Sequence, residues 1–164
     1  MMNKRAWLIA GTAATAFFLA GCASTPAAPK TVAEAIAANP QLTTLNKLIN
    51  DNDLAATLNS AGPFTVFAPT DDAFKAVPAR TWESLSKDKE RVAALLKFHV
   101  VPGTMTSDIV RNGTAPTLNG ATVALSRSGT FVTVEDAVVT TPDLKAGNGV
   151  VHLVDRVLTP PAAK

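Results

Sequence analysis

Hydrophobic residues in the first half of the chain recur every three or four positions, which is the spacing of one helix face. One such stripe consists of Leu42, Leu45, Leu48 and Ile49. Before it, Thr31 and Glu34 have the spacing of a capping box, which predicts a helix that begins near Thr31. After it, Asp53 is expected to cap a further turn that carries Leu54 and Leu58. We expect these helices to pack one face against a sheet.

The next elements are a strand and two helices. The apolar run from Phe64 to Ala68 predicts a buried strand, and Thr70 is placed to cap the helix that follows it. Asp71 and Asp72 then lie in the first helical turn, where carboxylates complement the helix dipole. Another helix is expected from about Lys87 to Lys97. Its inward residues are Val92, Leu95 and Leu96, and its solvated charged face consists of Asp88, Lys89, Glu90 and Arg91.

The second half of the chain is rich in valine and threonine, which favour strands. Expected strands lie around Thr122 to Leu125, Thr130 to Val134 and Ala137 to Thr141. Asn-Gly pairs begin at Asn112, Asn119 and Asn148, and each predicts a tight turn because both residues tolerate positive φ. A helix-rich half followed by a strand-rich half predicts an α+β domain.

A last strand is predicted near the C-terminus. Val150, Val151, Leu153, Val154, Val157 and Leu158 are interrupted by the polar residues His152, Asp155 and Arg156. This pattern predicts a long core strand that Pro160 and Pro161 terminate.

Three segments together resemble the motifs of fasciclin-like domains, an adhesion-associated family. They are T-V-F-A-P-T-D-D-A-F from Thr65, L-L-K-F-H-V-V-P-G from Leu95 and G-V-V-H-L-V-D-R-V-L-T-P-P from Gly149. The middle segment carries Phe98 where the family has tyrosine, so a role of that hydroxyl does not transfer. The resemblance implies a fasciclin-like β-sandwich or wedge of two small sheets with helices packed along one side. It identifies a fold better than a function.

The first 21 residues have the features of a lipoprotein signal peptide. Lys4 and Arg5 precede an apolar run from Trp7 to Ala20, and Leu19-Ala20-Gly21-Cys22 resembles a bacterial lipobox. Lipidation of Cys22 would consume the only thiol of the chain. An ordinary signal peptide cut elsewhere and a buried structural cysteine are the alternatives. Ala23 after the cysteine resembles lipoproteins that are sent to the outer membrane.

We therefore expect three regions: the signal peptide 1–21, a lipidated cysteine with a flexible tether 22–30, and one fasciclin-like domain 31–164. Without Lys4 and Arg5, 13 of the 15 basic residues remain, against 13 acidic residues. A neutral mature chain without a basic cluster gives no support for nucleic-acid binding. The protein is thus expected to be exported and held at the membrane by lipid, in the outer membrane or periplasm or at the cell surface.

Candidate partner-binding residues are His99, Asp143 and Leu144. Thr141-Pro142-Asp143-Leu144 resembles the Asp-Ile motif that mammalian members of the family use for integrin recognition, with Leu144 in place of isoleucine. The alternative is that Pro142 and Asp143 form a turn while Leu144 packs inward. His99 matches a family segment implicated in both fold integrity and adhesion, and a structural role is the alternative for His99 and for His152.

These features favour a non-enzymatic, lipid-anchored envelope protein whose domain mediates adhesion or binds a protein or glycan. No catalytic motif, metal spacing or cofactor fingerprint is found in the sequence. The main alternative is a carrier of an apolar, carotenoid-like small molecule in a groove between helices and sheet. The sparse aromatic content, seven Phe, two Trp and no Tyr, argues mildly against this alternative. An enzyme would need His99 or His152 beside a carboxylate in a cleft, and is the weakest of the three readings.

Overall fold

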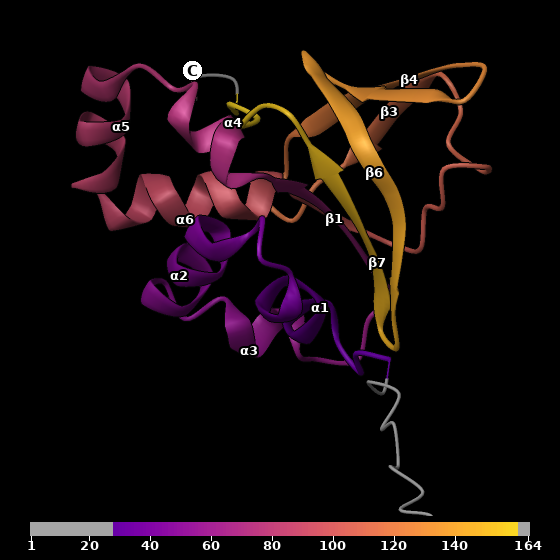
Figure 1. Ribbon diagram of the computed structural model, residues 1–164, viewed down its shortest axis with the longest axis horizontal. Coiled ribbons are helices and arrows are strands. Elements are labelled where there is room, and N and C mark those ends of the chain that lie inside the picture. Colours follow the sequence, from indigo (N-terminus) through magenta and orange to yellow (C-terminus); the bar gives the residue numbers. More distant parts are fainter. Residues whose placement is uncertain (1–27, 161–164) are drawn as a thin grey trace, which may run out of the picture.

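A computed structural model describes residues 28–160, in which six helices lie beside a curled sheet (Figure 1). The helices are α1 (Val32–Ala38), α2 (Thr43–Asp51), α3 (Ala55–Leu58), α4 (Asp71–Lys75), α5 (Ala79–Ser86) and α6 (Lys89–Phe98). The strands are β1 (Phe64–Pro69), β2 (Val100–Pro102), β3 (Gly113–Pro116), β4 (Thr122–Ser128), β5 (Phe131–Val134), β6 (Ala137–Ala146) and β7 (Gly149–Val154). The helices gather beside β1 and β7, away from β3 and β4, and α1 also contacts β6.

The strands follow the spatial order β2-β1-β7-β6-β5-β4-β3. Only β1 and β7 are parallel, and the other neighbouring pairs are antiparallel. β6 belongs to both halves, because its first residues pair with β5 and the rest with β7. One half of the sheet thus contains β2, β1 and β7, and the other contains β5, β4 and β3. The strand order ends in β2 on one side and β3 on the other. The Leu118 amide, just after β3, donates to the Val100 carbonyl of β2 over 2.8 Å and so links these two ends. The expected wedge of two small sheets is therefore a nearly closed, barrel-like α+β fold.

The central strands β1 and β7 are buried on both faces, so their side chains supply two cores. Val66, Ala68, Val151 and Leu153 point toward the helices and join the first core. Phe67 and Val154 point the other way and pack with Phe98, Val101 and the inward residues of β3 to β6 in the second core. All six residues of β7 are buried.

The start of the described chain is held against the turn between β6 and β7. The Gly147 amide donates to the Pro29 carbonyl over 3.1 Å, and the Asn148 Oδ1 accepts from the Val32 amide over 2.7 Å. The Asn148 Nδ2 also donates to the carbonyls of Leu58 and Ser60. One side chain therefore joins three segments that lie far apart in the sequence.

Side-chain caps begin three of the helices, as the sequence predicts for two of them. Thr31 accepts from the Glu34 amide and Thr70 from the Ala73 amide, while Asp88 caps α6. The prediction for Asp53 is wrong: this residue adopts φ +57°, and α3 instead begins after Leu54 without a side-chain cap. Aspartate tolerates the left-handed region, which here turns the chain between α2 and α3.

The C-terminal strand is shorter than the sequence predicts. It ends at Val154, not at the proline pair, because the chain leaves the sheet at Asp155. The Asp155 carboxylate accepts from the Val138 amide over 2.7 Å, and the Leu158 amide reaches the side chain of His99. Val157 and Leu158 still contact the two cores, so their apolar character reflects burial and not strand structure.

The three Asn-Gly pairs have different roles. Asn119-Gly120 lies in the turn between β3 and β4, whereas Gly147 and Asn148 form the loop between β6 and β7 and Gly149 already belongs to β7. Asn112 lies in a bend before β3, where its Oδ1 accepts from the Arg127 amide over 2.7 Å. A Cβ on Gly149 would lie 2.0 Å from the Phe64 carbonyl oxygen, so this glycine is required for close backbone packing.

Candidate functional site

Asp143 lies in a β-bulge within strand β6. The ladder between β6 and β7 pairs Thr141 with Leu153 and then Leu144 with Val151, so two residues of β6 oppose His152. Asp143 adopts φ +59° there, a left-handed conformation that aspartate tolerates. Leu144 is half-buried and packs against the first core.

The Asp143 carboxylate holds the segment that follows β2. Its Oδ1 accepts from the Ser107 amide over 2.8 Å, and its Oδ2 accepts from the Ser107 hydroxyl. The carboxylate is partly buried, and both of its oxygens are used within the chain. Asp143 therefore ties β6 to residues 104–107, and it offers a partner less free charge than an exposed loop aspartate.

His152 lies on the inner side of the same bulge with 1% of its surface exposed. Its Nδ1 accepts from the Asp143 amide over 3.2 Å, and its Nε2 contacts the Met105 carbonyl over 2.7 Å. The ring proton therefore belongs on Nε2, and the ring stacks on Phe67 with 5.5 Å between centroids. Burial lowers the pKa of His152, although the Met105 carbonyl and the charge of Asp143 oppose the shift.

Ser107, Asp143 and His152 share one network, but their geometry differs from that of a serine nucleophile triad. The serine hydroxyl donates to the carboxylate, whereas the imidazole receives its bond from a backbone amide. Backbone groups use both ring nitrogens, so the ring is not poised to accept a proton from the serine. The network shapes the backbone and does not activate a nucleophile.

His99 lies in the interior at the C-terminal end of α6, with 1% of its surface exposed. Its Nδ1 contacts the Leu95 carbonyl over 2.8 Å, and its Nε2 accepts from the Leu158 amide over 3.0 Å. Burial lowers the pKa of His99 to about 4, although the bond to Leu95 opposes the shift. The side chain is therefore neutral near pH 7, and a partner docked on the outer surface would not reach it.

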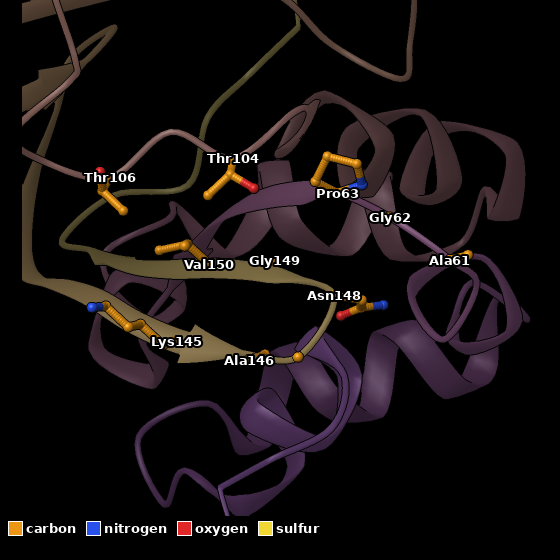
Figure 2. A pocket seen from close by; sticks show the side chains of 11 residues that line it. Ala61, Gly62, Pro63, Thr104, Thr106, Lys145, Ala146, Asn148, Gly149 and Val150 are labelled. Atoms are coloured by element: carbon orange, nitrogen blue, oxygen red, sulfur yellow. The ribbon is translucent and has the colours of Figure 1, made fainter.

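An open groove of about 540 Å³ lies beside the turn between β6 and β7. Figure 2 shows Thr104 and Thr106 on one side, Lys145 on the other and Val150 between them. Pro63 closes one end near Gly62. The groove thus combines an apolar floor with one cation and two hydroxyl groups. Asp143 holds the wall that carries Thr106, because it binds the adjacent residue Ser107.

The space between helices and sheet is nearly filled. An apolar void there, lined by residues that include Leu45, Ile49 and Val66, measures about 20 Å³. This volume is of the order of one water molecule. The void is far too small for a carotenoid-like molecule in the present arrangement of side chains.

Carboxylates also line a hollow of about 510 Å³ at the far end of β1 and β7. Asp71 accepts from the Thr43 hydroxyl over 2.7 Å and the Thr44 amide over 2.8 Å. These bonds lower its pKa, although partial burial opposes them. Asp72 pairs with Lys75, and Asp155 accepts from Val138. Local bonds thus account for these three carboxylates, and residues 28–160 contain no group of three or more candidate metal ligands.

The Fasciclin domain family matches residues 40–160, which is most of the described chain. This chain belongs to the fasciclin domain family. Protein sll1483 of Synechocystis is 41% identical over 133 residues, which are 80% of this chain and 74% of that protein. The cell surface glycolipoprotein MPB83 of Mycobacterium bovis is 36% identical over 149 residues, which are 88% of this chain and 64% of that protein.

A solved structure supports the same fold. The FAS1 domain pair from the insect cell adhesion molecule fasciclin I superposes with a TM-score of 0.64 at 17% identity. The match covers 79% of this chain and 51% of the insect structure. The fasciclin resemblance predicted from the three sequence motifs is therefore confirmed, and so is the α+β fold class.

The sequence singles out Asp143 and Leu144 as candidates, but it predicts neither the bulge of this fasciclin domain nor its contacts. Ser107 and Met105 carry no signal in the sequence, because their role depends on a loop that folds back onto β6. Cys22 and the signal peptide lie outside the described residues. Among the helices of residues 28–160, none has the length and apolar character needed to cross a membrane.

Proposed function

We propose that this fasciclin-domain protein is a lipid-anchored cell-envelope protein that holds a protein or glycan partner in adhesion. The observation that carries the proposal is the family membership, combined with the lipobox-like sequence at Cys22. Its relative MPB83 is a cell surface glycolipoprotein, which is consistent with a similar attachment here. The location is an outer membrane, periplasmic face or cell surface.

The attachment point suits a tethered domain. Residues that follow Cys22 lead to Pro29, whose carbonyl binds the turn between β6 and β7. An extended segment between Cys22 and Lys30 reaches at most roughly 29 Å. A lipid on Cys22 would therefore hold the domain close to the membrane, with this turn nearest to the anchor.

The groove next to that turn is the proposed contact region for a partner. Lys145, Thr104 and Thr106 provide polar groups around the apolar floor, and such a mixture suits an exposed recognition surface. Asp143 and Leu144 are proposed to act in this region by holding the wall and the strand in place. For His99, the proposed contribution is structural support from the core.

Replacement of the anchor residue tests the proposal. We expect Cys22→Ser to move the protein from the membrane fraction to the soluble exported fraction, because the acyl chains supply the membrane affinity. Ala23→Ser, which leaves the cysteine in place, is the matched control and should remain membrane-bound. A Cys22→Ser variant that still fractionates with membranes in full would contradict the anchoring proposal.

A further inference from the structure

Residues 104–107, which we call the wall segment, follow β2 and run along one side of the groove. The two threonines of the wall segment line the groove (Figure 2). The residue between them is bonded to the sheet on both sides of its peptide unit. The Met105 amide donates to the Thr65 hydroxyl over 2.8 Å, and the Met105 carbonyl lies 2.7 Å from Nε2 of His152. Side-chain bonds therefore hold this side of the groove to β1 and β7.

The second attachment of the wall segment is the carboxylate of Asp143 on β6. One of its oxygens accepts from the Ser107 amide over 2.8 Å, and the other accepts from the Ser107 hydroxyl. Because both oxygens bind the same residue, a movement of this carboxylate would free Ser107 from the sheet in one step. The wall segment would then be held through Met105 alone.

His152 connects the two attachments, because its ring nitrogens contact different backbone groups. Nδ1 accepts from the Asp143 amide over 3.2 Å, so the ring proton lies on Nε2 and faces the Met105 carbonyl. A second proton would have to occupy Nδ1, where it would point at the hydrogen of the Asp143 amide. The present arrangement therefore accommodates only the neutral ring.

The side chain of Asp143 can accept a hydrogen bond from a protonated ring. Among the groups of residues 28–160 that act on the pKa of His152, the Asp143 carboxylate is the charged one. The other neighbours of the ring are the stacked side chain of Phe67 and the Met105 carbonyl, which carry no charge. Asp143 is also half-buried, so solvent reaches the bulge. An imidazolium and a carboxylate form a strong, charge-assisted hydrogen bond.

We infer that His152 and Asp143 form an acid-operated switch that releases the wall segment of the groove. Nδ1 takes a proton from solvent, and the Asp143 carboxylate moves from Ser107 to the new N–H group. Ser107 then loses both of its bonds to the sheet. Burial lowers the pKa of His152 from 6.5, so the switch is closed at neutral pH and opens in acid. Regulation of partner contact by this switch rests on the proposed function of the groove.

Hydrogen exchange of the full mature protein in detergent, followed for single amides by NMR from pH 7 to pH 5, tests the switch. Protection factors are compared, because they remove the intrinsic effect of pH on exchange. We expect the protection factor of the Ser107 amide to fall at least about tenfold, as for the loss of a hydrogen bond to a charged group. The Thr44 amide is the internal control. It donates to Asp71 over 2.8 Å, and the lowered pKa of Asp71 preserves this bond at pH 5.

The nitrogen chemical shifts of the His152 ring report the proton directly. Nδ1 should change from an acceptor to a protonated nitrogen over the same pH range in which Ser107 loses protection. His99→Gln removes the other buried imidazole and should leave both changes in place. Protonation of the His152 ring without a loss of protection at Ser107 would contradict the switch.

Two variants separate the switch from a purely structural role. In His152→Gln, the amide group can accept from Asp143 and donate to Met105 without titrating, so Ser107 should keep its protection relative to Thr44 down to pH 5. Asp143→Asn keeps an oxygen for Ser107 but lacks the charge that receives the ring. It should move the titration of the His152 ring, and the loss of protection at Ser107, to more acidic pH. This second variant keeps the test decisive if His152→Gln weakens the fold.

Two further results would overturn the inference. They are a protection factor of Ser107 that follows that of Thr44 at every pH, and a response in His152→Gln as large as that of the wild type. In either case the anchoring proposal stands or falls separately on the fractionation of Cys22→Ser. If the switch operates but a partner purified with the protein stays equally bound at pH 7 and pH 5, the groove fails as the contact region and the switch stands.

Discussion

Both histidines of the chain are buried hydrogen-bonding residues. His99 and His152 are each 1% exposed, and each contacts backbone groups through both ring nitrogens. Both rings are buried, and neither is hydrogen-bonded to a carboxylate that would stabilise a positive charge. The imidazolium form is therefore disfavoured. A charge on either ring would therefore oppose folding.

This burial predicts that the protein loses stability in mild acid. The pKa of His99 falls from an ordinary value of 6.5 to about 4 in the folded state, so the unfolded chain binds more protons between these values. The stabilisation is complete above about pH 6.5 and is lost as the pH falls toward 4, by roughly 3 kcal/mol. The lowered pKa of His152 acts in the same direction.

Urea unfolding between pH 7 and pH 5 measures this loss before most carboxylates titrate. His99→Gln, which cannot titrate, should be less stable at pH 7 but should show a flatter dependence on pH. A wild-type free energy of unfolding that rises or stays constant from pH 7 to pH 5 would contradict the account.

The helix caps and the contacts of Asp143 and His152 show which interactions the sequence alone could predict. The caps at Thr31 and Thr70 follow from local chemistry and are found as predicted, because a cap needs only its own helix. The partners of Asp143 and His152 depend on residues 36 and 47 positions away in the chain. Such contacts leave no local pattern, so the sequence identified Asp143 as a candidate without its role.

At the scale of elements, the bulge in β6 connects the central sheet with residues 104–107. Asp143 supplies both bonds to Ser107, and its amide binds His152 on the opposing strand. Three elements thus meet at one aspartate. The bulge also lies next to the groove that Thr104, Thr106 and Lys145 line.

We predict that Asp143→Ala lowers the free energy of unfolding by about 1–3 kcal/mol, because the Ser107 amide loses its acceptor in a partly buried place. Hydrogen exchange should accelerate at Ser107 and its neighbours. Asp143→Asn keeps an acceptor oxygen and should lose less, and Asp136→Ala in the exposed turn after β5 should change little.

Partner binding and hydrogen exchange at Ser107, both measured on Asp143→Ala, distinguish a supporting role of Asp143 from a direct contact with the partner. Slower partner binding together with faster exchange at Ser107 would indicate that the carboxylate holds the groove wall. Loss of partner binding in Asp143→Ala with unchanged exchange at Ser107 would contradict this role and indicate a direct contact.

Elements with a strong local pattern were predictable, and those fixed by long-range packing were not. The helix with inward Val92, Leu95 and Leu96 is found as α6, which begins two residues after Lys87. The sequence did not predict α5, whose eight residues include no buried one. It extended β7 past Val154, because Val157 and Leu158 are apolar although they lie outside the sheet.

At the scale of the whole molecule, the sheet divides the domain into two sides. Helices cover one side of β1 and β7, and the curled strands β3 to β6 enclose the second core on the other. The closed arrangement explains the small void between helices and sheet. The sequence predicted the α+β class and the helical side, but it did not predict that the strands continue around a barrel.

The described chain begins beside the groove, so anchoring and partner contact are proposed at one end of the molecule.

Native mass spectrometry of the protein purified gently from the envelope of its own host tests the central claim most directly. We predict a mature chain that begins at Cys22, carries the added mass of acyl chains and travels with a stoichiometric protein or glycan partner. An unacylated chain without a partner would contradict the account, and a bound apolar small molecule in place of that partner would replace the adhesion proposal with ligand carriage.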